Sequence, residues 1–550
     1  MEWLVRYYLQ LNIMSYSIGI DLGTSNSCVA YCDQTNHSQV IAVNNHQLVE
    51  SVVDFYDPNN IRVGEGARKH NKGFEEGTVV RNNKRVLGRK FNDSKIKGFK
   101  EYCEAKVVED ADGFCAYDIP SMGGNVSTED AVVELLKVLY EAALKGRYGK
   151  PKEVWITIPA TYTQKQKSIT RHAANRVIKD IPIKFISEPS AAALHYSLST
   201  LITNGHVLIY DLGGGTFDVS IIRITNGYQY EILGTNGHPI IGGCLFDKYL
   251  LELARQKYKD QFGDDDDDLL PEEEDINVYN SALHKLLDIC RVKKEDLSSP
   301  NMDRVEIDMS EYFTYLNEER KKHGCTIYDA GDDDEPAVEE CIEIEVTRED
   351  FERLITQDIK TTIDLIKDCL ETCGLSKDDI DHILLVGGSS HIPLVKRLLR
   401  EEFGEKKIGA DINSDTCVAC GAALRGQNDF DHIREIKERS TFAIAIETAN
   451  NPYKELIPAN SKLPYSGFGD YKLHKCNPGF FNSSVYEKSG AGNKEYELIK
   501  HVTVEDDSFY DRARNIRVKY SLTKEGELTV SFIDLDDNDR LLRKEQRVLD

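Results

Sequence analysis

Two similar glycine turns constrain the fold of this chain more than any other feature of its sequence. The first, DLGTS, occupies residues 21–25 after apolar residues 18–20, and the second, DLGGGTFD, occupies residues 211–218 after apolar residues 207–210. A β-rich pattern resumes after each turn, which predicts a strand, a turn and a second strand. Two such hairpins in one chain predict two similar lobes that close on one ligand.

The residues of the turns indicate what that ligand is. Glycines have no side chains, so their backbone N–H groups can approach an anion closely. Mg²⁺ is usually held by one or two carboxylates, substrate phosphates and water. We therefore expect a polyphosphate at the glycines, with Asp211 and Asp218 as acceptors for a hydrated Mg²⁺ and the Thr216 hydroxyl as a donor to phosphate. A plain β-turn is the alternative for either turn alone, and neither is a P-loop, because each leads into a strand.

A βαβ unit between the two turns places a third carboxylate. Residues 153–158 predict a strand, residues 164–178 a helix and residues 184–187 a second strand, which ends at Glu188. Ligands of α/β sheets gather at the carboxyl ends of strands. Glu188 is therefore expected to position water or Mg²⁺, and the alternative is a partner for the dipole of the following helix.

A third glycine turn follows a strand predicted at residues 380–386. Gly387 and Gly388 end that strand, and the residues after them predict a helix. Because helix N-termini attract anions, this turn is expected to contact a nucleoside or phosphate, with a structural turn as the alternative.

The net charge and the cysteine content limit which classes of partner and which cellular compartment suit this chain. The formal net charge of −25 argues against nucleic acid and anionic membranes as partners, because like charges repel. The acidic residues 264–275 and 332–335 are expected to be solvated loops rather than a metal site. No apolar run approaches the ~18 residues that span a bilayer. The 13 scattered cysteines suit a reducing, cytoplasmic setting, and CVAC at residues 417–420 is expected to be a helix packing face rather than a redox or metal site.

The order of these patterns predicts the domains. We expect an N-terminal extension at residues 1–14, a nucleotide-binding domain at 15–426 (lobe I about 15–200, lobe II about 201–426) and a polar linker at 427–439. Residues 440–550 alternate with period two, and residues 516–522 are expected to pair with 528–532 across a turn at 524–526, which predicts a small β-sandwich.

Together these motifs resemble the heat shock protein 70 family of molecular chaperones, built on the actin-like ATPase fold that sugar kinases share. The resemblance covers nearly all of residues 16–426 and, more faintly, residues 440–535. It implies an α/β fold class, with a two-lobed actin-like ATPase of ribonuclease H-like halves followed by an all-β sandwich. The motifs that carry it are residues 20–24 (IDLGT), Gly64, 86–89 (VLGR), 158–160 (IPA), 187–192 (SEPSAA), 211–218, Gly242, Gly243 and 386–393.

By position, the resemblance implies ATP or ADP with Mg²⁺ as cofactors and a catalytic set of Asp21, Arg68, Glu188 and Asp211. Asp21, Glu188 and Asp211 would hold Mg²⁺, mostly through water, and Arg68 stands where the family has its catalytic lysine. The residues implied to contact the nucleotide are Gly23, Thr24, Ser25, Gly213, Gly214, Gly215, Thr216, Lys294, Ser298, Gly387, Gly388, Ser389 and Asp415.

Four of these family positions carry unusual residues. A guanidinium fork does not fit the geometry of a point-charge ammonium, so Arg68 predicts slow hydrolysis. His391 and Glu295 stand where many relatives have arginines flanking adenine, and Arg291 replaces an acidic residue near the ribose. A lost cation–π or stacking contact costs roughly 0.5–2 kcal/mol, so weaker nucleotide binding is expected.

The resemblance implies an ATP-dependent chaperone that binds and hydrolyses ATP to control its binding of unfolded or extended polypeptide. The implied partners are a J-domain co-chaperone and a nucleotide exchange factor, and Pro159 and Lys167 resemble the family's relay between the nucleotide and peptide domains. In the linker only Ile433 and Ile436 are apolar where the family has leucines, which predicts weak coupling between the domains.

No helical lid is expected after the last predicted strand, which predicts fast release of peptide. The alternative function is a weakly or non-hydrolysing, nucleotide-bound regulatory or scaffold partner of other chaperones, similar to lidless, ribosome-associated relatives. A sugar kinase of the same fold is a third possibility.

Overall fold

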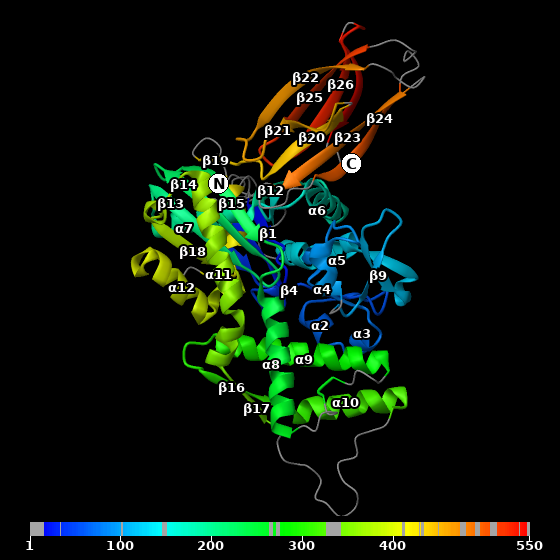
Figure 1. The fold of residues 1–550 in the computed structure, drawn as a ribbon, viewed down its shortest axis with the longest axis vertical. Coiled ribbons are helices and arrows are strands. Elements are labelled where there is room, and N and C mark those ends of the chain that lie inside the picture. Colours follow the sequence, from blue (N-terminus) through cyan, green and yellow to red (C-terminus); the bar gives the residue numbers. More distant parts are fainter. Residues whose placement is uncertain are drawn as a thin grey trace, which may run out of the picture.

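The structure is a computed structural model that describes residues 16–546, apart from residues 34, 101–102, 146–150, 263–267, 271–274, 326–342, 410–412, 428–429, 431–433, 449, 474–479, 490–495, 506–513 and 538. The predicted extension at residues 1–14, most of both acidic runs and Ile433 of the linker lie outside the described residues. Two α/β lobes lie side by side, and an all-β domain lies at one end of them (Figure 1). The predicted fold class is confirmed.

The sheet of lobe I carries the first glycine turn at the end of its central strand. Its order is β12-β11-β1-β2-β3, with β1 antiparallel to β2 and parallel to β11. Asp21 is the last residue of β1, so its carboxylate lies at the carboxyl edge of the sheet. The strands are β1 (Ser17–Asp21), β2 (Asn26–Cys32), β3 (Ser38–Ile41), β11 (Glu153–Ile158) and β12 (Ile183–Ser187).

The sheet of lobe II repeats this arrangement. Its order is β18-β13-β14-β15-β19, with β13 antiparallel to β14 and parallel to β18. Asp211 lies near the end of β13 and opposite Asp218 of β14, so the two glycine turns occupy equivalent places in the two lobes. The strands are β13 (Gly205–Leu212), β14 (Phe217–Thr225), β15 (Gln229–His238), β18 (His382–Val386) and β19 (Glu435–Lys437).

Helices α7 (Glu188–Thr200) and α13 (Cys417–Arg425) form the core where the lobes meet. Small residues let them pack closely, because a β-carbon at Gly421 would overlap the carbonyl oxygen of Ala191. Cys417 and Cys420 are buried free thiols in this contact. The prediction that residues 417–420 form a packing face is therefore confirmed.

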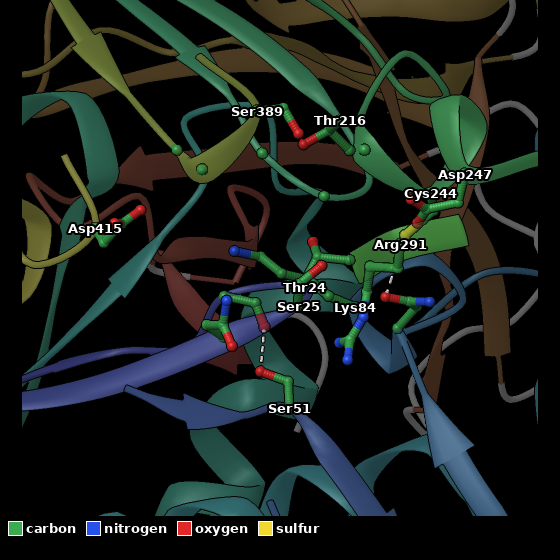
Figure 2. Close-up of a pocket in the computed structure, with 18 of the residues that line it drawn as sticks. Thr24, Ser25, Ser51, Lys84, Thr216, Cys244, Asp247, Arg291, Ser389 and Asp415 are labelled. Carbon is green, nitrogen blue, oxygen red and sulfur yellow. Dashed lines mark hydrogen bonds between the residues drawn. The ribbon is translucent and has the colours of Figure 1, made fainter. Parts of the chain in front are cut away.

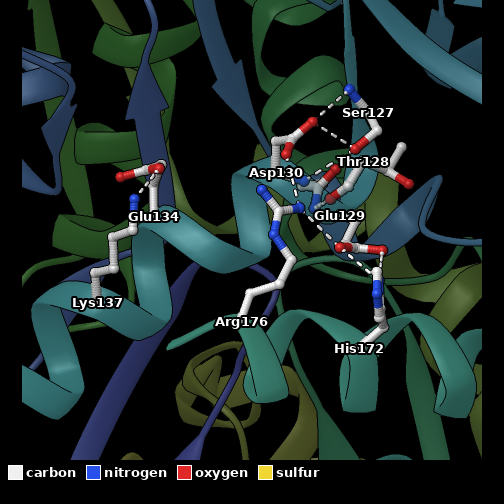
Figure 3. Close-up of polar contacts among 9 residues, drawn as sticks. Ser127, Thr128, Glu129, Asp130, Glu134, Lys137, His172 and Arg176 are labelled. Atoms are coloured by element: carbon white, nitrogen blue, oxygen red, sulfur yellow. Dashed lines mark hydrogen bonds and ion pairs between the residues drawn. The ribbon is translucent and has the colours of Figure 1, made fainter. Parts of the chain in front are cut away.

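Helices α5 (Thr128–Lys145) and α6 (Gln164–Val177) pack together on lobe I. Ser127 and Asp130 form the reciprocal hydrogen bonds of a capping box at the start of α5 (Figure 3). Glu129 then joins the two helices, because it contacts His172 and Arg176 of α6 at 2.8 and 2.7 Å (Figure 3).

The remaining elements complete the two lobes. In lobe I they are β4 (Val49–Glu50), β5 (Val52–Asp54), β6 (Arg62–Val63), α2 (Glu65–Arg68), α3 (Asn71–Glu75), β7 (Val79–Arg81), α4 (Lys97–Lys100), β8 (Lys106–Glu109), β9 (Cys115–Ile119) and β10 (Gly124–Ser127). In lobe II they are α8 (Gly243–Phe262), α9 (Ile276–Leu297), β16 (Arg304–Asp308), α10 (Ser310–His323), β17 (Glu343–Thr347), α11 (Arg348–Cys373) and α12 (Pro393–Phe403).

Two four-stranded sheets form the C-terminal β-sandwich. The predicted pairing across residues 524–526 is confirmed, since Val518 pairs with Phe532 and Leu522 with Leu528, and the inward side chains of both sheets make one apolar core. One sheet contains β20 (Phe442–Thr448), β21 (Asn451–Ile457), β23 (Phe480–Ser489) and β24 (Glu497–Glu505); the other contains β22 (Tyr465–Leu473), β25 (Arg514–Leu522), β26 (Leu528–Asp534) and β27 (Arg540–Gln546). Among the helices that the structure describes, none has the length and apolar character of a membrane span.

The linker attaches to both lobes through backbone, polar and apolar contacts. Residues Glu435–Lys437 form β19, which adds a parallel edge strand to β15 of lobe II. Glu438 is partly buried against lobe I, where it accepts hydrogen bonds from the hydroxyls of Ser187 and Ser190 at 3.0 and 2.8 Å. The linker therefore docks through its main chain, through the Glu438 carboxylate and through Phe430 and Ile436, which pack against the apolar core between the lobes.

The sandwich also contacts the start of α6 directly. The backbone N–H of Gln164 donates to the carboxylate of Glu487 at 3.1 Å, and Arg171 pairs with Glu527 at 2.6 Å. A carboxylate from the sandwich thus satisfies an N–H at the N-terminus of a lobe I helix, where the helix itself provides no acceptor.

This contact predicts that docking of the sandwich weakens as the pH rises. Burial raises the pKa of Glu487 from 4.5 to about 7, although the hydrogen bond from the Gln164 N–H lowers it and Glu497 of the same sheet adds to the rise. The docked state therefore binds the proton more tightly than a solvated carboxylate does. The contribution is full below pH 4.5 and is lost as the pH rises toward 7, a change of about tenfold or more in the docking equilibrium. Interdomain energy transfer between pH 5 and 8 measures it, and Glu487→Gln, which does not titrate, should flatten the profile. A profile unchanged by that substitution would contradict the assignment.

Candidate functional site

A cavity of about 600 Å³ lies between the two lobes and is lined by all three glycine turns. Thr24, Ser25 and Lys84 reach it from lobe I, and Ser389 and Asp415 reach it from lobe II (Figure 2). Residues more than 300 positions apart in the sequence are thereby brought to one place. The residues predicted to form the site all line this cavity, with the exception of Arg68, Gly215 and Asp218.

Four carboxylates gather where the first two turns face each other. Burial, and next the neighbouring Glu188, raise the pKa of Asp21 and of Asp218 to about 6 and raise the pKa of Asp211 well above its usual range. Threonine hydroxyls orient two of the groups: Thr157 donates to Asp21 at 2.9 Å and Thr161 to Asp218 at 3.0 Å. The carboxylates therefore repel one another and hold protons more tightly than usual, and a cation beside them would relieve that repulsion.

The cation at the carboxylates is Lys84, which the sequence analysis missed. Its ammonium donates to Glu188 at 2.7 Å, and its side chain is partly buried beside the acidic groups. Burial lowers its pKa, but the pull of Glu188 and its acidic neighbours is stronger overall, so the net shift is upward and the lysine is charged. A signal for it was present, because Lys84 lies two residues before the VLGR motif at residues 86–89.

Arg68 lies elsewhere, which corrects its predicted place at the catalytic centre. It is in the short helix α2, where its guanidinium pairs with Glu50 at 2.8 Å and approaches Asp288 of lobe II at 3.8 Å. It does not line the cavity. The reason is the fold: β7 and the turn after it, rather than α2, lead the chain to the carboxylates. The argument for slow hydrolysis that rested on Arg68 therefore falls away.

The glycines bring the turns into contact at the centre of the cavity. A β-carbon at Gly214 would collide with the hydroxyl of Ser25, and one at Gly387, whose φ is +81°, would lie 2.7 Å from Asp211. Gly215 packs against Thr24 instead of lining the cavity, and a β-carbon there would lie 2.8 Å from the Thr24 side chain. Side chains at Gly214 and Gly387 would fill the space beside the backbone N–H groups.

The far end of the cavity carries the other predicted contact residues. Lys294 pairs with Asp247 at 2.6 Å, and Ser298 follows four residues later, where its hydroxyl donates to the carbonyl of Lys294. His391 shares a hydrogen bond with the hydroxyl of Ser414 at 2.8 Å and lies 3.8 Å from Asp415. These groups form a polar rim on lobe II beyond the glycine turns.

Comparison with known protein families shows to which family this chain belongs. The sequence model of a family described as Hsp70 protein matches residues 17–323 and 334–545. The chain belongs to the Hsp70 family. The resemblance drawn from the motifs is confirmed, and membership supports a chaperone of the Hsp70 type. Hsp70 proteins generally bind ATP or ADP with Mg²⁺, unfolded polypeptides and co-chaperones.

The cavity of this Hsp70 chain fits a magnesium nucleotide. Within the described part of the chain, no group of three or more His, Cys, Asp or Glu side chains is arranged to hold a bare metal ion. Mg²⁺ keeps several of its waters and is shared with substrate phosphates, so it needs carboxylates at a distance rather than a closed cage. The carboxylates of Asp21 and Asp211, which line the cavity beside a side-chain-free glycine cradle, meet that requirement.

Proposed function

We propose that this chain is an Hsp70-type chaperone that binds ATP with Mg²⁺ between its lobes, hydrolyses it, and thereby controls binding of extended polypeptide by its β-sandwich. The observation that carries the proposal is the Lys84–Glu188 pair among carboxylates, directly beside the glycine cradle. Phosphoryl transfer requires positioning and neutralisation of charge more than covalent chemistry, and this site supplies both.

Each group has a role in the proposed reaction. Backbone N–H groups of the glycine turns, with the hydroxyls of Thr24, Ser25 and Thr216, bind the phosphates. Lys84 places a fixed positive charge where negative charge develops on the transferred group. The carboxylates of Asp21, Glu188 and Asp211 would hold Mg²⁺ through its water shell and orient the attacking water, and the bound ion would supply neutralisation of phosphate charge. The residues proposed to bind the nucleoside are Lys294, Ser298, Gly388, Ser389 and Asp415.

The linker supports communication between the nucleotide and the sandwich. Ser187 and Ser190, which hold the linker residue Glu438, flank Glu188 in the sequence. A change at Glu188 on hydrolysis therefore reaches the linker through one turn of α7. We further propose a J-domain co-chaperone and a nucleotide exchange factor as partners and the cytoplasm as the compartment.

Calorimetry and single-turnover hydrolysis on the purified chain test the proposal. We expect Mg²⁺-ADP and Mg²⁺-ATP to bind, and hydrolysis to accelerate when a J-domain protein and an extended apolar peptide are added. Retained nucleotide without turnover would select a regulatory or scaffold partner of other chaperones, the function that His391 at the nucleoside end favours. Absence of nucleotide binding at millimolar concentration would refute both.

Asp211→Asn separates binding from catalysis. Asparagine keeps an oxygen acceptor for a metal-bound water but loses the charge, so we expect nucleotide to bind while single-turnover hydrolysis falls by about 10–100-fold. Rapid-quench measurement of phosphate release checks this, with Asp381→Asn, a carboxylate at the opposite end of β18 from the cavity, as the matched control. Full turnover in Asp211→Asn would show that the chemistry occurs elsewhere.

A further inference from the structure

The last turn of α11 carries two thiols that the proposed nucleotide chemistry does not use. Cys369 and Cys373 are four residues apart and therefore share one face of the helix. A β-carbon at Gly234 of β15 would lie 2.6 Å from the sulfur of Cys373 and 3.7 Å from the sulfur of Cys369. Both sulfurs thus converge on the same spot of the lobe II sheet.

The two thiols are chemically unequal. Cys369 is 2% exposed, whereas Cys373 is only partly buried. They share a hydrogen bond that raises the pKa of Cys369 and lowers the pKa of Cys373, and the guanidinium of Arg439 lowers the pKa of Cys373 further. Cys373 is the more exposed thiol and the one that interacts with Arg439, so it is the sulfur that this arrangement favours as the nucleophilic thiolate, with Cys369 as its hydrogen-bond partner.

The pair lies beside the attachment of the sandwich to lobe II. Arg439 donates to the carbonyl of Ile232 in β15 at 2.8 Å and to the carbonyl of Asn460 in the sandwich at 3.0 Å. It also pairs with Glu231 at 3.2 Å. One guanidinium therefore connects β15 to the sandwich and favours the thiolate of Cys373.

We propose that Cys369 and Cys373 form a peroxide-sensitive dithiol whose oxidation loosens the Arg439 attachment of the sandwich. The Cys373 thiolate attacks one oxygen of a hydroperoxide, the O–O bond breaks, and a sulfenic acid forms. The Cys369 sulfur then attacks the sulfenyl sulfur, an S–S bond forms, and the hydroxyl leaves as water with the Cys369 proton. With hydrogen peroxide, two thiols and one peroxide give one disulfide and two waters.

Closing this disulfide requires the end of α11 to change shape. Neighbouring Cβ atoms four residues apart on a helix are about 5–6 Å apart, whereas a disulfide needs about 3.5–4.5 Å. The helix ends at Cys373, and Gly374 follows with φ +67°, so only the last turn has to tighten. The movement draws Cys373 away from Gly234 and removes the thiolate that faces Arg439.

Competitive alkylation of the full, reduced chain tests whether Cys373 is the more nucleophilic thiol. With limiting iodoacetamide and peptide mass spectrometry, Cys373 is expected to react about tenfold faster than Cys103 and Cys244, which are also partly buried and whose pKa values burial raises. Cys369→Ala removes the donor and should slow Cys373 by about tenfold, whereas Cys369→Ser restores a donor and should recover the rate. Equal reactivity of all three thiols, or no effect of Cys369→Ala, would overturn the proposal.

Treatment with hydrogen peroxide tests whether the disulfide forms and whether it loosens the attachment of the sandwich. The wild-type chain should lose two hydrogens of mass between Cys369 and Cys373, and amide exchange at residues 435–439 should quicken. Cys373→Ser should show neither change, and Cys369→Ser should form the sulfenic acid without the disulfide. Disulfide formation with unchanged amide exchange would refute the link to the sandwich. Nucleotide hydrolysis enters none of these measurements, so they stand apart from the proposed function.

Discussion

Replacing Lys84 by alanine is expected to slow single-turnover ATP hydrolysis by about 1000-fold while Mg²⁺-ADP still binds. The ammonium lies 2.7 Å from Glu188 and also faces Asp21 and Asp211. Alanine leaves these carboxylates without that cation and removes the charge that would stabilise the transferred phosphoryl group. Rapid-quench hydrolysis gives the rate, and calorimetry shows that the nucleotide still occupies its site.

Arg68→Ala is the matched control for Lys84. Both residues are cations of lobe I paired with a glutamate, but Arg68 pairs with Glu50 outside the cavity. Exposed or partly exposed ion pairs contribute roughly 0–1 kcal/mol to stability, and this pair lies outside the cavity. We therefore expect the rate of single-turnover hydrolysis to change by no more than a few-fold. If Arg68→Ala were the slow variant and Lys84→Ala the active one, the place that the structure gives the two residues would be wrong.

The second large effect is on folding: Gly421→Ala is expected to destabilise the chain by about 3 kcal/mol or more. The added methyl group would overlap the carbonyl oxygen of Ala191. Both partners belong to helices packed in the buried core between the lobes, so neither can move without opening that core. Urea unfolding followed by far-UV circular dichroism measures the loss.

Gly66→Ala separates this clash from the general effect of adding a methyl group. Gly66 lies in α2, where a β-carbon would meet nothing within 4 Å. Alanine in a helix is favoured over glycine by roughly 0.5–1 kcal/mol, so this variant should be as stable as the wild type or slightly more stable. Equal stability of both variants would argue against close packing of α13 on α7.

Local patterns predicted much of the fold, because each depends on a few adjacent residues. The hairpins at the two glycine turns, the βαβ unit and the β25–β26 pairing all formed as expected, since apolar alternation and turn residues decide them locally. The packing of residues 417–420 was predictable for the same reason, because consecutive small residues favour close packing of one helix against another.

The candidate site was predicted less completely, because the fold brings its residues together from distant parts of the sequence. Arg68 and Lys84 are both basic residues in lobe I, and the VLGR motif that follows Lys84 is the local signal that distinguishes them. The path of the chain after β7 brings Lys84 to Glu188, 104 residues away. Docking of the linker was predicted only in part, because it depends on backbone pairing with β15 and on the hydrogen bonds of Glu438 as well as on the apolar side chains of Phe430 and Ile436.

The edge strand β19 of the lobe II sheet belongs to the linker and not to the lobe itself. While Glu435–Lys437 pair with β15, the hydrogen-bonding groups along that border of the sheet are satisfied within the chain. Without the linker, those groups would face solvent and would form a template for any extended segment nearby. The hydrogen bonds of β19 therefore also protect the border of the lobe II sheet from pairing with a foreign strand.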